Sequence, residues 1–230
     1  PDEAAPALPG LDILFEDAGL LAVNKPAGLC SHAGTRHRDS VADRLKALRA
    51  GASFSPTLAH RLDKDTSGIL LVAKSYAELR RLGELFALGG ERGGAAKTYL
   101  AWVDGVWPGA GLDAPEILED RLDRLELEEG RVAGRRKVVD ATASTGAEAR
   151  AGKLARCEVR PVLRKRSATL LAVRLFTGRT HQIRVQLSLR GHAVISDGVY
   201  GRKVRGVPML LHALRLDLPG VSLFAPPPWA

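Results

Sequence analysis

The most constraining feature of the sequence is a loop of reactive polar side chains that leads directly into a short apolar run. Residues 60–65 contain one His, two Asp, one Arg and one Lys, and the apolar run extends from Ile69 to Ala73. A run of this length that contains Ile and Val, after the turn residues Thr66-Ser67-Gly68, predicts a strand buried on both faces. Rigid elements position reactive loops well, so the arrangement suits an active site. A solvated charged turn before a core strand is the alternative, and the residue types alone do not separate the two.

The charge balance favours a polyanionic partner. The chain has 34 Lys and Arg against 26 Asp and Glu, a net charge of +8 and a pI of about 9.9. Phosphate contacts by such side chains supply most non-specific affinity for nucleic acids. Aromatic residues make up only 5% of the chain, which argues against a single-strand binder built on stacked rings.

The apolar runs, the cysteines and the missing motifs argue against a membrane protein, a disulfide-rich or zinc protein, and a cofactor-dependent enzyme. No window approaches the roughly 18 consecutive apolar residues of a membrane helix. Cys30 and Cys157 lack CxxC spacing, so neither a disulfide framework nor a zinc site is indicated, which fits a cytoplasmic protein. No phosphate-binding loop, dinucleotide turn or metal-ligand cluster is present, so no cofactor and no metal are expected.

Hydrophobic periodicity predicts a mixture of strands and short helices. A hairpin is expected from the runs 13–15 and 20–23, and a second one from 155–163 and 168–176, with the basic tip Arg164-Lys165-Arg166. Helices are expected after the N-cap Ser40, after the capping-box residues Ser75 to Glu78, and after the N-cap Thr180. Residues 97–103 have strand composition, whereas 104–136 resemble a weakly structured insertion with a basic cluster, Arg135-Arg136-Lys137, that could contact phosphate.

The string HRLDKDTSGILLVAK at residues 60–74 resembles the signature of the RluA-type family of RNA pseudouridine synthases. The other family motifs follow in chain order: Lys25-Pro26-Ala27-Gly28, Lys97-Thr98-Tyr99, TGRTHQIR at 177–184, Arg190-Gly191-His192, DGVYG at 197–201 and Leu211-His212-Ala213. Two positions depart from the pattern, Gln186 where His is common and Ser196 where Gly usually precedes the Asp. Neither departure touches the proposed chemistry.

The resemblance implies a fold and a set of catalytic residues. The expected fold is a single α+β pseudouridine synthase domain over residues 11–218, with a mixed, mostly antiparallel sheet, flanking helices and a central basic cleft. Residues 1–10 would be a flexible lead-in and 219–230 a Pro-rich tail. Asp63 would be the catalytic carboxylate, Arg184 its charge partner, and Tyr99 the ring that stacks on the target base.

Further residues are expected at the substrate. Arg61, beside the catalytic loop, would fill the stack that a flipped uridine leaves. His60 would fix the loop as a hydrogen-bond donor, and His181 and Gln182 would orient the helix that carries Arg184. Lys25 would line the cleft, although the residues alone favour a surface lysine. With Lys97 and Arg179, these complete the predicted RNA-binding set: Arg61, His60, Lys25, Lys97, Arg179, His181 and Gln182.

The predicted function is isomerisation of specific uridines in structured RNA, with large-subunit ribosomal RNA as the first target and tRNA as the second. The chain would act as a monomer, without a membrane partner. Two other classes stay open: a non-catalytic RNA-binding module that retains the fold, and a hydrolase that uses Asp63 with His60 or His181. The hydrolase would need a second acid or a nucleophilic Ser, and no GxSxG elbow is present.

Overall fold

The computed structural model describes residues 11–33, 39–46, 54–108, 115–124, 136–139 and 152–229. The chain divides into two compact units rather than the one domain expected from the resemblance. Unit 1 comprises Pro1–Lys97 and His212–Ala230, and unit 2 comprises Thr98–Leu211. Arg135 lies outside the described residues, as do Leu48 and Gly51 of the first expected helix.

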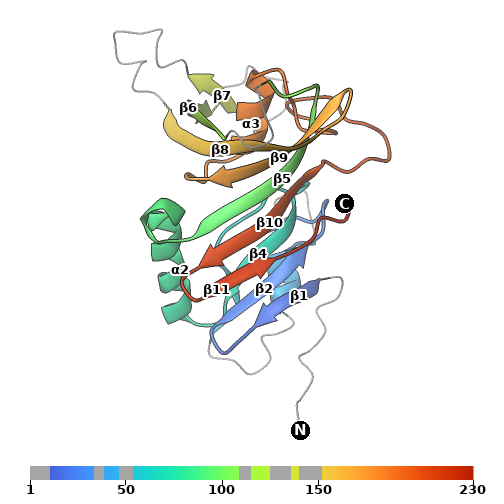
Figure 1. The fold of residues 1–230 in the computed structure, drawn as a ribbon. Coiled ribbons are helices and arrows are strands. Elements are labelled where there is room, and N and C mark those ends of the chain that lie inside the picture. Colours follow the sequence, from blue (N-terminus) through green and yellow to red (C-terminus); the bar gives the residue numbers. More distant parts are fainter. Residues whose placement is uncertain are drawn as a thin grey trace. The chain divides into compact units, whose positions relative to one another are not determined.

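Unit 1 is built on a mixed, mostly antiparallel set of strands (Figure 1). In spatial order these are β1 (Asp12–Glu16), β2 (Leu20–Lys25), β4 (Ser67–Ala73), β10 (Leu211–Leu218) and β11 (Val221–Phe224), with β3 (Thr57–Leu58) also paired to β4. Among the described strand pairs of unit 1, the β4–β10 pair is parallel and the others are antiparallel. The predicted hairpin at 13–23 is confirmed by β1 and β2. The predicted Pro-rich tail is wrong at its start, because β11 forms an antiparallel hairpin with β10 before the chain reaches its prolines.

The strand predicted at residues 69–73 is confirmed and is buried along its whole length. It begins two residues earlier than expected, since Ser67 and Gly68 already pair with β10, and the turn lies at Lys64-Asp65. Gly68 has φ +107°, and a Cβ there would lie 2.3 Å from the Ala213 carbonyl oxygen. The glycine therefore permits the close approach of β10 to β4 rather than a turn.

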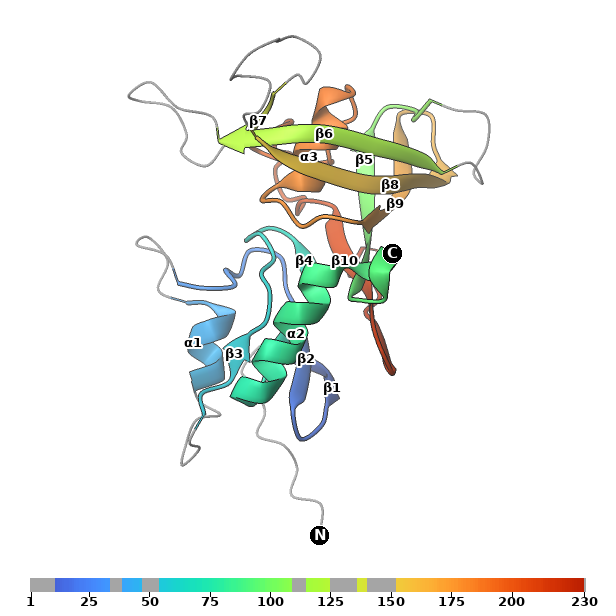
Figure 2. The same cartoon turned by 90° about the vertical axis from the view of Figure 1, so that its left-hand side faces the viewer.

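Two helices lie on the same side of the unit 1 strands (Figure 2). In α1 (Val41–Leu45) and α2 (Tyr76–Leu88), the predicted caps Ser40 and Ser75 each accept a first-turn backbone N–H at 3.1 Å. A 3-10 turn, η2 (Gly90–Arg92), follows α2. Helix α2 packs on the apolar face of the strands, and the core there contains Leu20, Ala22, Ile69, Leu71, Leu82 and Leu216.

Unit 2 combines a second group of strands with one helix. Its strands are β5 (Ala96–Asp104), β9 (Ala168–Leu175), β8 (Lys153–Arg164), β6 (Glu116–Arg124) and β7 (Arg136–Val139), in spatial order. The β8–β9 hairpin confirms the period-two pattern. The predicted insertion is wrong in part, because β6 pairs antiparallel with β8 over seven residues and β7 pairs with β6.

Helix α3 (Gln182–Leu189) lies against β6 and β8 through Val185, which packs on Leu122 and Ala155. The predicted N-cap Thr180 is wrong by one residue. His181 is the N-cap, in the left-handed conformation at φ 57°, and its side chain makes no capping bond. Together the two units confirm an α+β protein with mostly antiparallel strands.

Candidate active site

The loop that carries Asp63 is fixed on both sides of that residue by the segment that follows β2. On one side, Ser31 Oγ accepts the Leu62 backbone N–H at 3.0 Å and donates to the Leu62 carbonyl at 2.7 Å. On the other side, the Lys64 carbonyl accepts from Lys25 Nζ at 3.0 Å and from the Gly28 backbone N–H at 2.9 Å. The backbone at Asp63 is thus braced by the Lys-Pro-x-Gly motif and by Ser31 directly after it.

Lys25 is neither a surface lysine nor a residue placed to contact RNA. Its side chain is fully buried, and Nζ donates to the carbonyls of Pro26, Leu29 and Lys64 at 2.9, 2.8 and 3.0 Å. Burial lowers the pKa of Lys25 to about 8, while the nearby Asp65, Cys30 and Asp63 favour the charged form. The expectation that Lys25 lines the substrate cleft is therefore wrong, because three backbone carbonyls hold its ammonium in the interior.

His60 fixes the loop as an acceptor through Nε2, and a hydrogen bond to the backbone at Arg61 is consistent with the predicted role as a donor. Its Nε2 accepts the Leu71 backbone N–H at 3.1 Å, which requires an unprotonated nitrogen at that position. Burial, with a smaller contribution from the charge of Lys97, lowers the pKa of His60 to about 3. The His60 ring lies 4.9 Å from Phe86, and Lys97 Nζ lies 5.2 Å from the same ring, where burial also lowers the pKa of Lys97. These three side chains are half-buried in unit 1 and lie against one another.

In unit 2, Arg184 forms a buried two-point ion pair with Asp197. Arg184 Nε lies 2.7 Å from Asp197 Oδ2, and Nη2 lies 2.9 Å from Oδ1, with side-chain exposures of 6% and 0%. Asp197 Oδ1 also accepts the backbone N–H groups of Val199 and Tyr200. Burial opposes ionisation of Asp197, but these bonds and the Arg184 charge outweigh it and hold the pKa of the carboxyl below its usual value.

Tyr200 and His181 complete the surroundings of Arg184. The Arg184 guanidinium lies over the Tyr200 ring at 5.2 Å, and the Tyr200 hydroxyl lies 2.9 Å from His181 Nδ1. The prediction that His181 orients the residues around Arg184 is thus consistent with these contacts. Sequence reasoning missed Asp197, although it lies in the matched DGVYG motif. An Asp directly before a Gly turn, with backbone N–H groups two and three residues later, was a usable signal.

Gln182 is buried, and its amide is engaged within unit 2. Its Oε1 accepts from the Thr177 hydroxyl at 2.8 Å and from the Arg179 backbone N–H at 3.0 Å, while Nε2 donates to the Arg156 carbonyl at 3.1 Å. The assignment of Gln182 to RNA binding is therefore wrong. Its side chain instead sets the shape of the Thr177–Arg179 loop, in addition to the predicted role at the start of α3.

The roles assigned to three further site residues stay predictions, and the structure gives only their positions. Arg61 is exposed on the loop before Asp63, Tyr99 is a buried residue of β5, and Arg179 is exposed on the loop that precedes α3. Sequence reasoning also missed Ser31, and no local pattern marks it, because its bond partner Leu62 is 31 residues away.

The two departures from the family pattern both have local explanations. Ser196 adopts a left-handed conformation at φ 65°, which glycine reaches without strain. Here the serine hydroxyl donates to the Val207 carbonyl at 2.7 Å, which gives the side chain a compensating bond. Gln186 is fully buried and donates to Asp120 at 2.7 Å and to the Ala155 carbonyl at 3.2 Å, tying α3 to β6 and β8.

Comparison with known proteins identifies the family. The family model described as RNA pseudouridylate synthase matches residues 19–189, about three quarters of the chain. The chain belongs to this family. Ribosomal large subunit pseudouridine synthase C of Haemophilus influenzae is 37% identical over 191 residues, which are 83% of this chain and 53% of that protein. Ribosomal large subunit pseudouridine synthase D of Zymomonas mobilis is 35% identical over 214 residues, 89% of this chain and 60% of that protein.

These relatives confirm the RluA-type resemblance, and the chain spans about half the length of those it matches. Solved structures support the fold. Human RNA Pseudouridylate Synthase Domain Containing 1 aligns with a TM-score of 0.74 at 24% identity, covering 98% of this chain and 87% of that one. Human RNA Pseudouridylate Synthase Domain Containing 4 aligns with a TM-score of 0.72, also at 24% identity, covering 94% and 88%.

Metal-ligand clusters and membrane-spanning helices are absent from the part of the chain that the structure describes. No group of three or more His, Cys, Asp or Glu side chains there could hold a metal ion. Within the same ranges, no helix has the length and apolar character needed to cross a membrane.

Proposed function

We propose that this chain isomerises specific uridines in structured RNA to pseudouridine. Large-subunit ribosomal RNA is the first candidate substrate, because relatives at 35–38% identity are named for that subunit, and tRNA is the second. The proposal places the protein in the cytoplasm, where it acts as a monomer. It requires no cofactor, because the reaction is an isomerisation.

The observation that carries the proposal is the bracing of the Asp63 loop. The reaction breaks the N1–C1′ bond of uridine, turns the base and joins C5 to C1′. A carboxylate must act at the sugar, either by attacking C1′ or by removing the C2′ proton, and its position must be fixed to within a fraction of an ångström. Ser31 and Lys25 fix the backbone at Leu62 and Lys64, the two neighbours of Asp63. The motif that begins at Lys25, the adjacent Ser31 and the motif that contains Asp63 thus act together to position one carboxylate.

The other family motifs supply the remaining roles in the proposal. The resemblance assigns Arg184 as the permanent cation that favours the ionised form of the catalytic carboxylate, and within unit 2 its planar fork is held in one orientation by Asp197. Tyr99 holds the plane of the base while it turns. Arg61, exposed beside the loop, occupies the gap in the RNA stack from which the uridine is extruded.

The structure weakens the hydrolase alternative. A hydrolase would use His60 or His181 as the base. His60 has a pKa of about 3 and uses Nε2 to accept a backbone N–H, so it cannot take up a proton near neutral pH. His181 Nδ1 is hydrogen-bonded to the Tyr200 hydroxyl, so this nitrogen positions Tyr200 instead of acting as a base. A non-catalytic RNA-binding module needs no base, so the surroundings of His60 and His181 do not argue against it. The following experiment separates it from the proposal.

Asp63→Asn should abolish isomerisation, with a loss of at least ~10³-fold, because catalytic groups of this kind contribute about 10²–10⁴-fold and more when they attack covalently. The measurement is pseudouridine formation in ribosomal RNA transcripts, with RNA affinity followed in parallel. Asp65→Asn is the matched control, since Asp65 is an exposed carboxylate two residues away. Residual activity of Asp63→Asn above one part in a thousand would remove Asp63 from the chemistry. A wild-type chain that binds RNA and forms no pseudouridine would support the binding module.

A further inference from the structure

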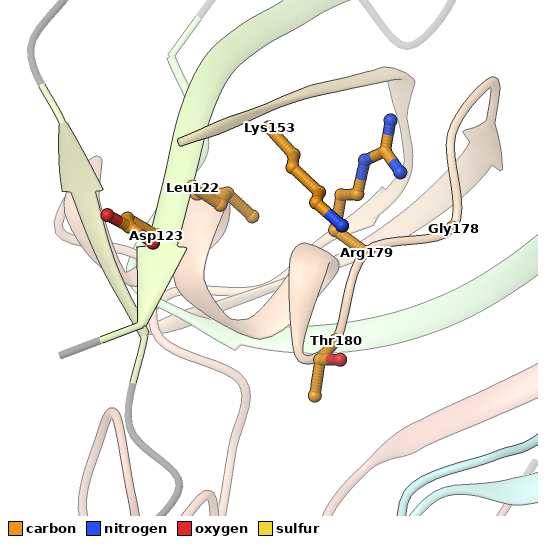
Figure 3. A pocket seen from close by; sticks show the side chains of 6 residues that line it. All are labelled: Leu122, Asp123, Lys153, Gly178, Arg179 and Thr180. Atoms are coloured by element: carbon orange, nitrogen blue, oxygen red, sulfur yellow. The ribbon is translucent and has the colours of Figure 1, made fainter. Parts of the chain in front are cut away.

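A cavity of about 220 Å³ lies in unit 2 (Figure 3), and neither Arg184 nor Asp197 is among the described residues that line it. It is lined by residues from β6, from the start of β8 and from the loop before α3: Leu122, Asp123, Lys153, Gly178, Arg179 and Thr180. Strand register brings Leu122 and Lys153 together at the cavity, because the two residues lie opposite each other in the β6–β8 pair. Of its lining residues only Arg179 belongs to the predicted RNA-binding set, and none takes part in the proposed chemistry at Asp63.

Two cations line the cavity. Lys153 and Arg179 come from different elements, and both side chains lie on the same side of β6 (Figure 3). The Asp123 carboxylate points to the opposite side of the strand in that view, as expected for a residue adjacent to the inward-facing Leu122. Two positive charges at one concave space favour an anion over a cation there, so the arrangement suits an anionic ligand.

Arg179 is held in place before any ligand arrives. Its Nε donates to the Leu154 carbonyl at 2.8 Å, and its backbone N–H donates to Gln182 Oε1 at 3.0 Å. Gln182 is itself fixed by the Thr177 hydroxyl and the Arg156 carbonyl. A guanidinium anchored through Nε still has its two terminal nitrogens for a planar, two-oxygen group, which is the geometry that arginine offers to phosphate.

We propose that this cavity binds a backbone phosphate of the substrate RNA, a step that rests on the proposed function. The size argues for a single phosphate and its sugar, since the cavity is below the roughly 300–1,000 Å³ of sites for larger organic ligands. Among the described residues that line the cavity there is no aromatic ring on which a base could stack. The Thr180 hydroxyl adds a neutral donor of the kind that frequently contacts phosphate oxygens.

The test measures RNA affinity by fluorescence anisotropy between 50 and 200 mM salt, for wild type and for Lys153→Gln, Arg179→Gln and the double variant. Each lost phosphate contact should reduce the slope of log K against log salt by about 0.7–0.9. Over that fourfold rise in salt, the fold-loss of RNA affinity should therefore be about three times smaller for a single variant than for wild type. Lys203→Gln is the control, because it removes one exposed charge from unit 2 outside the cavity.

Arg179→Lys tests the anchoring separately. It retains the charge but loses the Nε bond to Leu154, so the salt slope should stay near wild type while affinity falls by several-fold. Thermal melting of each variant checks that the unit remains folded. Titration with inorganic phosphate, followed through the NMR signals of the Gly178 and Thr180 amides, tests the alternative source of the same chemistry.

The outcomes separate the two proposals. A reduced slope in the cavity variants, with Lys203→Gln unchanged, supports an RNA phosphate. Equal slopes in all four proteins, with wild type still forming pseudouridine, would overturn the cavity proposal and leave the function intact. Saturable binding of inorganic phosphate with no change in RNA slope would also overturn it, in favour of a small anion. A wild-type chain that forms no pseudouridine would instead count against the function.

Discussion

The Asp63 loop of unit 1 and the Arg184 helix of unit 2 are fixed by different kinds of interaction. At Asp63 the bracing acts on the backbone, through Ser31 at Leu62 and Lys25 at Lys64. At Arg184 the bracing acts on the functional side chain itself, through a two-point ion pair with the buried Asp197. At Asp63, the Ser31 hydroxyl and the buried Lys25 ammonium bind peptide groups. At Arg184, a carboxylate binds the guanidinium directly.

The difference follows from the length of the two side chains. Aspartate has two side-chain torsions, so a fixed backbone restricts its carboxylate strongly. Arginine has a long, flexible side chain whose guanidinium can adopt many positions from one backbone, and ordering it costs about 2 kcal/mol of rotamer entropy. A second carboxylate is needed to select one orientation. The comparison predicts that the two regions respond differently to substitution, pH and charge.

The largest effect is expected for Asp197→Asn. Removing one partner of a buried ion pair typically costs about 3–5 kcal/mol. The free energy of unfolding in urea should fall by that amount, and turnover should fall at least tenfold under conditions where the variant stays folded. Asp217→Asn is the control, since it breaks an exposed Arg–Asp pair at 2.9 Å and should change stability by about 0–1 kcal/mol. Equal effects of the two variants would show that burial of the Arg184 pair has no energetic consequence.

A smaller effect is expected for Lys25→Met. The variant deprives the Pro26, Leu29 and Lys64 carbonyls of a donor, at roughly 1–3 kcal/mol for each group left unsatisfied, although loss of a buried charge offsets part of this. Stability should fall by about 2 kcal/mol, and kcat should fall more than RNA affinity because the Asp63 loop is loosened. Lys46→Met removes an exposed lysine of comparable size and serves as the control. If RNA affinity alone changed, Lys25 would be a substrate contact after all.

The pH dependence of activity gives a third test. Lys25 has a pKa of about 8, and the neutral amine has two N–H donors for three carbonyls. Activity should therefore decrease several-fold as the pH rises through about 8, and Lys25→Met should lack that decrease on the same RNA. Stability should change with the opposite sign. Because the folded pKa is below the ordinary value of 10.5, the unfolded chain binds more protons between pH 8 and 10.5, and the Lys25 contribution rises over that range. An activity profile identical in the two proteins would exclude this coupling.

The smallest effect concerns His60. Its folded pKa of about 3 lies below the ordinary 6.5, so the unfolded chain takes up the proton first as the pH falls. Stability contributed by neutral His60 is present above pH 6.5 and is lost towards pH 3, by at most about 1.4 kcal/mol per pH unit. Urea denaturation of wild type and His60→Gln at pH 5 and pH 7 should show a steeper dependence in wild type. His32→Gln, at an exposed position, should behave as wild type.

Much of the local structure could be predicted from the sequence because short-range physics determines it. The buried β4, the Ser40 and Ser75 caps, the first hairpin and the alternating β8 all depend on residues within a few positions of one another. The motif spacing was also sufficient to identify the family. These features are recorded in composition and periodicity, which a linear reading captures directly.

The tertiary structure decided which polar side chains serve the substrate and which serve the fold. Three polar side chains of the family motifs are hydrogen-bonded to backbone or side-chain partners inside their own unit: Lys25, His60 and Gln182. Their partners Lys64, Leu71 and Arg156 are 39, 11 and 26 residues away in the chain. Burial and hydrogen-bond satisfaction depend on neighbours brought together by folding, and no sequence spacing encodes them. A polar residue in a motif is therefore a candidate for the site, and its surroundings in the folded chain decide its role.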